Sequence, residues 1–261
     1  MSAPATVVVH ADAALLAEAA AARLVTRLVD AQAARGRAHV VLTGGGIGTA
    51  ALKALVGTPA RDAIDWAALD VWWGDERFLP PGHPDRNETQ ARDALLDHVP
   101  LDPRRVHPMG ALDEPWGDDV DAAAAAYADE LRGAARPEER GGAPAFDVLM
   151  LGVGPDGHVA SLFPEHPALY ETERTVVGVR GAPKPPPVRI TLTMPVIHAA
   201  SEVWLLAAGA EKAAAVAMAL SSAGEVAVPA AGAQGTRATV WLLDRAAAAR
   251  VPPALTRISS P

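Results

Sequence analysis

The sequence of 261 residues contains no cysteine, and this absence alone excludes several chemistries. Disulfide bonds, thiolate nucleophiles, zinc–thiolate sites and iron–sulfur clusters all require that residue. The sequence also lacks any apolar segment long enough to span a bilayer, and its N-terminus lacks the basic region of a signal peptide. We therefore expect a cytoplasmic protein.

Positive charge is scarce as well, with 23 Lys and Arg against 31 Asp and Glu and no block of basic residues. The formal net charge of −8 disfavours nucleic acid and anionic membranes as partners, so an anionic substrate would need a locally positive pocket. Half of the residues are hydrophobic, which allows a sizeable core. We expect one globular domain over residues 1–261.

Short β-branched segments alternate with alanine-rich ones, a pattern typical of an α/β fold whose mostly parallel sheet is covered on both faces. We expect strands near Val7, up to Thr43, and from Leu69, Phe146, Thr175, Glu202 and Thr239. We expect helices over 13–34, 88–98, 120–132 and 211–220. Ligands of open α/β sheets bind outside the carboxyl ends of the strands, so the residues just after each strand are the first candidates for function.

Three consecutive glycines, Gly44, Gly45 and Gly46, come after the strand that ends at Thr43 and precede a helical segment. Glycines in that place expose backbone N–H groups at a helix N-terminus, which suits the binding of a phosphate. A tight turn without a ligand fits the same pattern equally well. The Gly-Lys-Ser/Thr of a Walker motif is absent after them.

Asp75, Glu76 and Arg77 stand at the end of the strand that begins at Leu69. Charged residues that emerge together from a buried strand can place an anion-binding guanidinium in a cleft. A surface ion-pair cluster is the alternative, and Asn87 in the loop beyond is compatible with a helix cap.

Gly152, Gly154 and Gly157 come after another strand with the GxGxxG spacing of a dinucleotide-binding fingerprint. Pro164 would truncate the crossover helix of such a motif, which argues against that interpretation. What remains is a glycine-rich turn that delivers His158 to the start of a short helix. The positive end of that helix would favour the neutral imidazole that a general base requires. A capping or core role is the alternative for a lone histidine.

Lys184 and Arg189 bracket a run of prolines. Proline fixes φ, so this loop would hold a cation rigidly, as a preorganised phosphate clamp requires. An extended linker into the next strand is the alternative. No GxSxG elbow surrounds Ser161, and no pair of histidines has metal-ligand spacing, so we expect neither an esterase serine nor a metal or other cofactor.

Taken together, TGGG, GDER, GVGPDGHVASLFPEHP and PKPPPVRITLT resemble the motifs of the 6-phosphogluconolactonase family in order and approximate spacing. The resemblance extends from about Val41 to the C-terminal TVWLLDRAAA. The related glucosamine-6-phosphate isomerase/deaminases share the Gly-Asp-Gly-His core but differ after it. The resemblance implies a Rossmann-like three-layer α/β/α sandwich that hydrolyses 6-phospho-D-glucono-1,5-lactone to 6-phosphogluconate in the oxidative pentose phosphate pathway.

By that resemblance, His158 is the base that activates water, and Arg77 is a second catalytic residue that binds substrate or stabilises charge. The substrate-binding candidates are Gly44, Gly45, Gly46, Asp75, Asp156, Gly157, Lys184 and Arg189, the last two completing a phosphate site. The sequence departs from the family pattern at Gly46 and Ala231, where a serine is frequent. Each departure removes a hydroxyl.

We expect a small phosphosugar lactone as the partner, and a monomer or weak homodimer. Two other functions remain compatible with the residues. The first is an isomerase/deaminase of amino-sugar phosphates that uses the same histidine. The second is a sugar-phosphate-binding protein in which the glycines and cations bind but no base acts.

Overall fold

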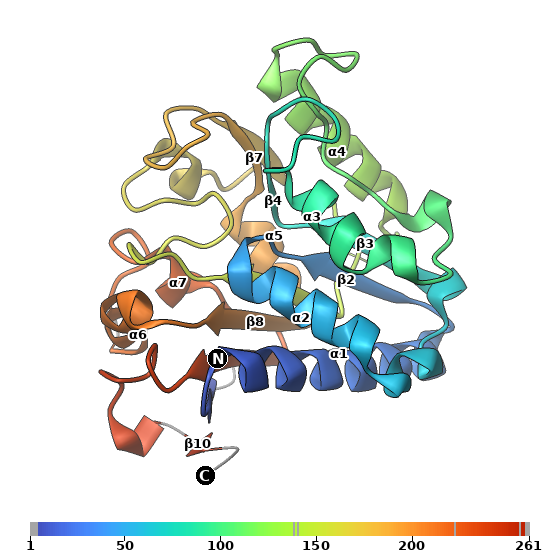
Figure 1. The fold of residues 1–261 in the computed structure, drawn as a ribbon. Helices are drawn as coiled ribbons and strands as arrows, with labels where there is room; N and C mark the ends of the chain where they lie inside the picture. The colour runs from blue at the N-terminus through green and yellow to red at the C-terminus, as the bar shows by residue number, and fades with distance from the viewer. Residues whose placement is uncertain (1–4, 138, 140, 222, 256, 259–261) are drawn as a thin grey trace.

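The computed structural model describes residues 5–137, 139, 141–221, 223–255 and 257–258. Seven strands within them form one parallel sheet with the order β10-β1-β9-β8-β5-β2-β3 (Figure 1). They are β1 Thr6–His10, β2 Ala38–Leu42, β3 Leu69–Trp73, β5 Val148–Gly152, β8 Glu202–Ala207, β9 Ala238–Asp244 and β10 Arg257–Ile258. Six of them are strands that the apolar segments predicted, and their buried side chains suit a sheet covered on both faces.

Three short strands form a separate antiparallel sheet in the order β4-β7-β6, with β4 Asp75–Arg77, β7 Arg189–Leu192 and β6 Val176–Val179. The strand expected from Thr175 is present as β6, but it belongs to this sheet and not to the parallel one. Arg77 of β4 lies opposite Arg189 of β7, and residues directly opposed in an antiparallel pair project from the same face. The small sheet therefore brings together two arginines that are distant in sequence.

Helices occupy most of the connections between strands. The α-helices in the described residues are α1 Ala13–Arg35, α2 Gly45–Gly57, α3 Asn87–Ala94, α4 Val120–Ala134, α5 Met194–Ala199, α6 Ala213–Leu220 and α7 Pro229–Gly232. Short 3₁₀ helices lie at Pro59–Ala63, Trp66–Ala68, Leu96–His98, Pro103–Arg105, Pro167–Tyr170, Ala210–Lys212 and Pro253–Leu255. Helices α1 and α2 pack side by side, whereas α4 packs against the small sheet (Figure 1). None of the described helices combines the length and the apolar character needed to cross a membrane.

Helix α1 shows how local sequence determines an element. Asp12 accepts a hydrogen bond from the Leu15 N–H at 2.9 Å and caps the first turn, and Gly36 ends the helix in the left-handed region with a φ of 74°. Its buried residues recur at three- and four-residue spacing, namely Leu16, Ala17, Ala20, Ala21, Leu24, Val25, Leu28 and Ala31. The helix predicted over 13–34 is confirmed.

The arrangement is an α/β sandwich around a mostly parallel sheet, which confirms the predicted Rossmann-like fold class. Strand β5 pairs in parallel with β2 on one side and with β8 on the other. The carboxyl ends of these three strands therefore meet at one edge of the sheet, toward which the β8 arrow points in Figure 1. Side chains just beyond the ends of these strands can therefore converge on one place.

Candidate active site

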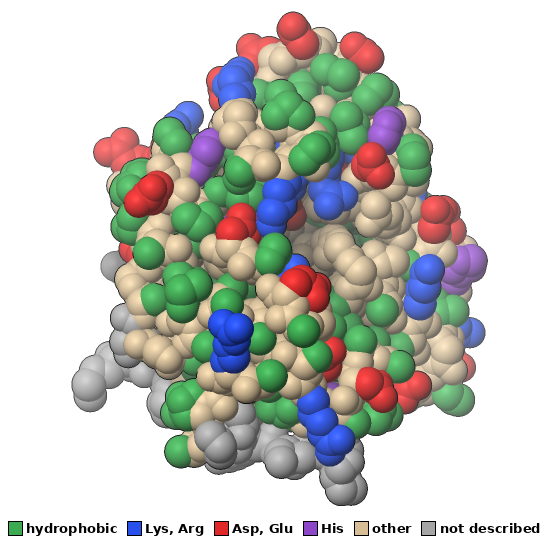
Figure 2. All heavy atoms as spheres, turned by 60° about the vertical axis from the view of Figure 1, so that its left-hand side comes forward, with side chains coloured by type: hydrophobic (Ala, Val, Ile, Leu, Met, Phe, Trp, Pro, Cys, Tyr) green, Lys and Arg blue, Asp and Glu red, His purple; other side chains and the backbone are tan. Residues whose placement is uncertain are grey.

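A cavity of about 550 Å³ opens at this edge of the sheet. Figure 2 shows that this face of the molecule is hollowed, with basic side chains gathered beside the hollow. The candidates among its lining residues are Gly44, Gly45, Gly46, Asp75, Arg77, His158, Lys184 and Arg189. Loops that are far apart in the sequence therefore face a single cavity, in a protein whose overall charge is negative.

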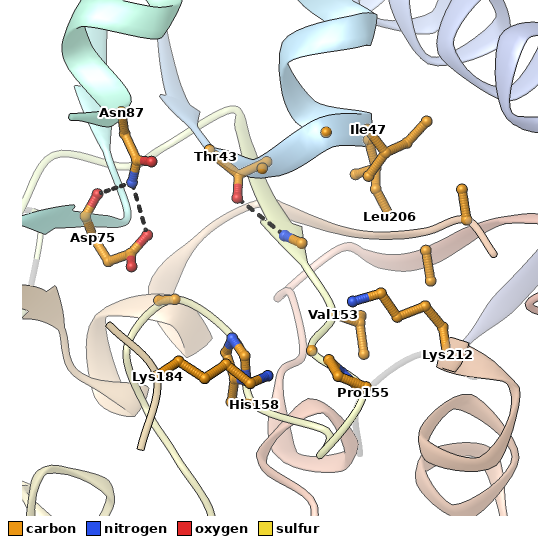
Figure 3. Close-up of a pocket in the computed structure, with 18 of the residues that line it drawn as sticks. Thr43, Ile47, Asp75, Asn87, Val153, Pro155, His158, Lys184, Leu206 and Lys212 are labelled. Atoms are coloured by element: carbon orange, nitrogen blue, oxygen red, sulfur yellow. Dashed lines mark hydrogen bonds between the residues drawn. The ribbon is translucent and has the colours of Figure 1, made fainter. Parts of the chain in front are cut away.

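His158 lies on the turn after β5, and its ring is directed into the cavity (Figure 3). Its Nδ1 lies 2.5 Å from Oδ1 of Asp156, and Lys184 Nζ lies 3.2 Å from the same oxygen. When Nδ1–H donates to Asp156, Nε2 carries the lone pair. Asp156 thus fixes the orientation of the imidazole and favours the tautomer in which Nε2 can accept a proton.

The Asp156 carboxyl is well suited to that role because it stays ionised. Burial opposes its ionisation, but the hydrogen bond and charge of His158 and those of Lys184 outweigh burial and hold the pKa of Asp156 well below its ordinary value. Asp156 supports the imidazole and does not line the cavity wall itself. Gly157, also expected to bind substrate, does not line the cavity either; it has a φ of 82°, and its carbonyl accepts a hydrogen bond from the Ala230 N–H.

The expectation that a short helix begins at His158 is wrong. Val159 makes isolated β-bridges with Val153 and with Leu162, and Ala160 has a φ of 50°, which no helix accommodates. The segment is therefore a turn and supplies no helix dipole of its own to the imidazole. The contact with Asp156 determines the orientation and the tautomer of the ring.

Gly154 provides the space for this pair of side chains. A Cβ at Gly154 would lie 2.0 Å from His158 Nδ1 and 2.4 Å from Asp156 Oδ1. The central glycine of the spacing that resembles a dinucleotide fingerprint thus has a different physical basis, which is room for an imidazole against the backbone.

The glycine run lies at the N-terminus of a helix, as predicted. Helix α2 begins at Gly45, and Gly44 occupies the N-cap position without a capping side chain. The first N–H groups of the helix therefore remain available to an anion. A Cβ at Gly44 would lie 1.8 Å from Asn87 Oδ1, so only glycine allows this close approach.

Asp75 is a buried acceptor fixed by two neighbours, of which Figure 3 shows Asn87. Asn87 Nδ2 donates to the Asp75 carbonyl oxygen at 2.8 Å and to Oδ1 at 3.3 Å, and Ser161 Oγ donates to Oδ2 at 2.7 Å. The hydroxyl of Ser161 is thereby committed to Asp75, in agreement with the expectation that Ser161 is not a nucleophile. Asn87 lines the cavity, although the sequence indicated only a turn or cap.

The two arginines of the small sheet have different surroundings. Arg77 donates from Nη1 to the Asp85 carbonyl oxygen at 2.5 Å. Arg189 uses Nε and Nη2 to bind carbonyl oxygens of the proline loop, that of Pro186 at 3.0 Å and that of Lys184 at 3.0 Å. Burial lowers the pKa of Arg189, with Asp75 opposing the shift and Arg77 adding to it. Arg189 therefore holds the loop that presents Lys184, and its Nη1 lies 4.0 Å from Asp75 Oδ2 in a buried ion pair.

Sequence reasoning missed Lys212, whose side chain reaches into the cavity from the 3₁₀ turn after β8 (Figure 3). Burial lowers the pKa of Lys212, with Glu211 opposing the shift and the charge of Lys184 adding to it. The available signal was its position shortly after a strand, combined with a count of only three lysines. The remaining one, Lys53, lines a neighbouring cavity of about 750 Å³.

Ala231, where the family pattern frequently has a serine, lies away from the main cavity and lines a separate one together with His198. Gly46, the other position that differs from the family pattern, does line the main cavity.

Across the described parts of the chain, no group of three or more His, Asp and Glu side chains is arranged to hold a metal ion.

Replacing Gly44 by alanine is expected to lower kcat/KM by roughly 10-fold or more, because the new Cβ would displace Asn87 and, through it, Asp75. Steady-state kinetics of lactone hydrolysis would test this, and a melting curve would show that the variant is folded. Gly57→Ala is the matched control, since it lies at the other end of α2 and a Cβ there meets nothing within 4 Å. Equal kinetics for the two variants would contradict the importance of this contact.

Comparison with known proteins places this geometry in context. A family model described as glucosamine-6-phosphate isomerases/6-phosphogluconolactonase matches residues 11–241. A 6-phosphogluconolactonase of Streptomyces coelicolor is 70% identical over 216 residues, which cover 83% of this chain and 83% of that protein. One of Mycobacterium tuberculosis is 50% identical over 212 residues, covering 81% of this chain and 84% of the relative. The solved structure of 6-phosphogluconolactonase from Trypanosoma brucei has a TM-score of 0.82 at 28% identity, covering 95% of this chain and 99% of that one. The range matched by the family model contains every residue that lines the cavity.

Proposed function

The chain belongs to the glucosamine-6-phosphate isomerase/6-phosphogluconolactonase family, and from this membership we propose that it hydrolyses 6-phospho-D-glucono-1,5-lactone to 6-phosphogluconate. This reaction is part of the oxidative pentose phosphate pathway. One geometric observation supports the activity above the others. An imidazole held at Nδ1 by an ionised carboxylate faces a cavity that positive side chains also line.

His158 is the general base of the proposed reaction. Its Nε2 takes a proton from a water molecule as the water oxygen attacks the lactone carbonyl carbon. The tetrahedral oxyanion then collapses, the bond to the ring oxygen breaks, and the proton passes from the imidazolium to that oxygen to give a hydroxyl. A lactone is an activated ester, so no covalent intermediate with the protein is required.

The basic side chains supply binding and charge stabilisation. Arg77, Lys184 and Lys212 line the cavity together with the N–H groups at the start of α2. These groups can hold the phosphate at one end of the substrate and stabilise the oxyanion at the other. Binding energy from the remote phosphate would then orient the carbonyl against His158.

We propose further that the chain acts in the cytoplasm as a single domain and as a monomer or weak homodimer. Without cysteine the chain has no use for an oxidising compartment, and the basic side chains of the cavity offer a local positive site for a small anionic substrate despite the net charge of −8.

Freshly prepared 6-phosphogluconolactone should be hydrolysed well above its spontaneous rate, and a chelator should leave the rate unchanged because the proposed base needs no metal. The assay measures lactone loss with and without chelator, corrected for spontaneous opening. Inhibition by the chelator would contradict the metal-free mechanism. Ammonia release from glucosamine-6-phosphate would indicate the isomerase/deaminase, and tight phosphosugar binding without hydrolysis would indicate a binding protein.

A further inference from the structure

The carboxylate of Glu76 is completely buried beside the cavity, yet it does not line it. Its Oε1 accepts hydrogen bonds from the N–H groups of Arg77 and Asn87, both at 2.7 Å, and its Oε2 accepts one from the N–H of Glu88 at 2.8 Å. Three backbone donors on one buried carboxylate fix it in a single orientation.

Glu76 takes the place of a helix cap. Asn87 and Glu88 are the first two residues of α3, and the N-cap residue Arg86 makes no capping bond with its side chain. The carboxylate of Glu76 satisfies these two N–H groups from a different element and lies at the positive end of the helix. Arg86 Nη2, at 3.8 Å from Glu76 Oε2, provides a compensating charge, and Arg86 itself is almost fully buried.

Two of the three residues that Glu76 fixes, Arg77 and Asn87, line the cavity. Side chains alternate along a strand, so Asp75 and Arg77 project to the cavity side of β4 while Glu76 projects toward α3. Asn87, held through its N–H, bonds Asp75 through its side chain, and Asp75 accepts from Ser161 Oγ. A continuous path of hydrogen bonds thus runs from Glu76 to the turn that carries His158.

We propose that Glu76 is a positioning residue of the hydrolysis, which sets the places of Arg77 and Asn87 in the cavity without contacting the substrate. This inference rests on the proposed function. Loss of the carboxylate would release the start of α3 from β4 and let both cavity residues move. The cost falls on the transition state, since the fixed geometry matters most when charge develops on the substrate.

Glu76→Gln tests this, because it keeps the shape but presents an N–H₂ group to one of the backbone donors. The expected result is a kcat lowered by roughly 10- to 100-fold with little change in KM. Asp119→Asn is the matched control, since Asp119 caps α4 through the N–H groups of Asp121 and Ala122, away from the cavity. Its kcat is expected to stay at the wild-type value even where its melting temperature falls.

A folded Glu76→Gln protein whose kcat stays within about twofold of wild type would overturn the proposal, and so would an equal loss of kcat in Asp119→Asn. Should Glu76→Gln not fold, Glu76→Asp takes its place, because it keeps the charge but withdraws it from the same donors. The same fall in kcat is expected, and a wild-type kcat would overturn the proposal.

Amide proton chemical shifts give a readout that does not depend on activity. Burial raises the pKa of Glu76 to about 7, against the opposing effects of Arg86 and the three N–H groups, so the comparison is made above that pH. The amide protons of Arg77, Asn87 and Glu88 are expected to move in Glu76→Gln but not in Asp119→Asn. Unmoved shifts would overturn the proposal. If the wild type does not hydrolyse the lactone while Glu76→Gln still moves these amide protons, the proposed function is contradicted and the contacts of Glu76 are not.

Discussion

His158→Ala is expected to lower kcat by roughly 10²- to 10⁴-fold, the contribution typical of a positioned general base. The alanine variant retains the cavity and its basic side chains, so binding of the phosphosugar should be affected much less than turnover. Lactone hydrolysis is measured at saturating substrate, and the spontaneous rate is subtracted. This subtraction is essential because the lactone opens unaided.

The imidazole of His158 also packs against the Phe163 ring with the centroids 4.5 Å apart, so the variant needs a melting curve alongside its kinetics. His198→Ala serves as the control, because His198 bonds the Gly232 carbonyl oxygen beside a separate cavity. It should retain wild-type turnover. Full activity in a folded His158→Ala protein would remove this histidine from the mechanism.

The apolar segments of the sequence predicted most of the parallel sheet correctly, since a buried strand must be apolar over nearly its whole length. Strand β4 could not be recognised in the same way. It has only three residues, all charged, and its partner β7 lies more than a hundred positions further along the chain. The pairing of Arg77 with Arg189, which brings two cations together, therefore becomes visible only in the structure.

The candidate residues were found where strands end, because parallel strands bring the residues beyond their carboxyl ends to a common edge. The orientation of those residues depends on contacts that sequence spacing does not reveal. Helix α3 illustrates this, since Arg86 is a poor N-cap residue and the capping carboxylate of Glu76 comes from another element. The turn at His158 illustrates it too, because the left-handed φ of Ala160 has no local sequence signal.

Asp156→Asn is expected to lower kcat by roughly 10²- to 10³-fold, through the tautomer of the base. The carboxylate can only accept a hydrogen bond, so it requires the proton on His158 Nδ1 and leaves the lone pair on Nε2. An asparagine amide can donate to Nδ1 instead, which places the proton on Nε2 and removes the acceptor for the water proton. KM should change less than kcat, since Arg77 and Lys212 keep their places and only Lys184 loses an ion-pair partner.

The same substitution has an expected signature in the pH dependence of stability. The folded pKa of Asp156 is lowered below its ordinary value of 3.8, so its ionised pairing with His158 and Lys184 stabilises the wild type above that pH. This contribution is lost as the pH falls from 3.8 through the folded pKa. The melting temperature of Asp156→Asn should therefore lie furthest below wild type near neutrality and approach it in acid. Asp62→Asn, at an exposed ion pair, should show neither effect. A constant difference at every pH, with unchanged kcat, would contradict the assignment of Asp156 as the partner of the base.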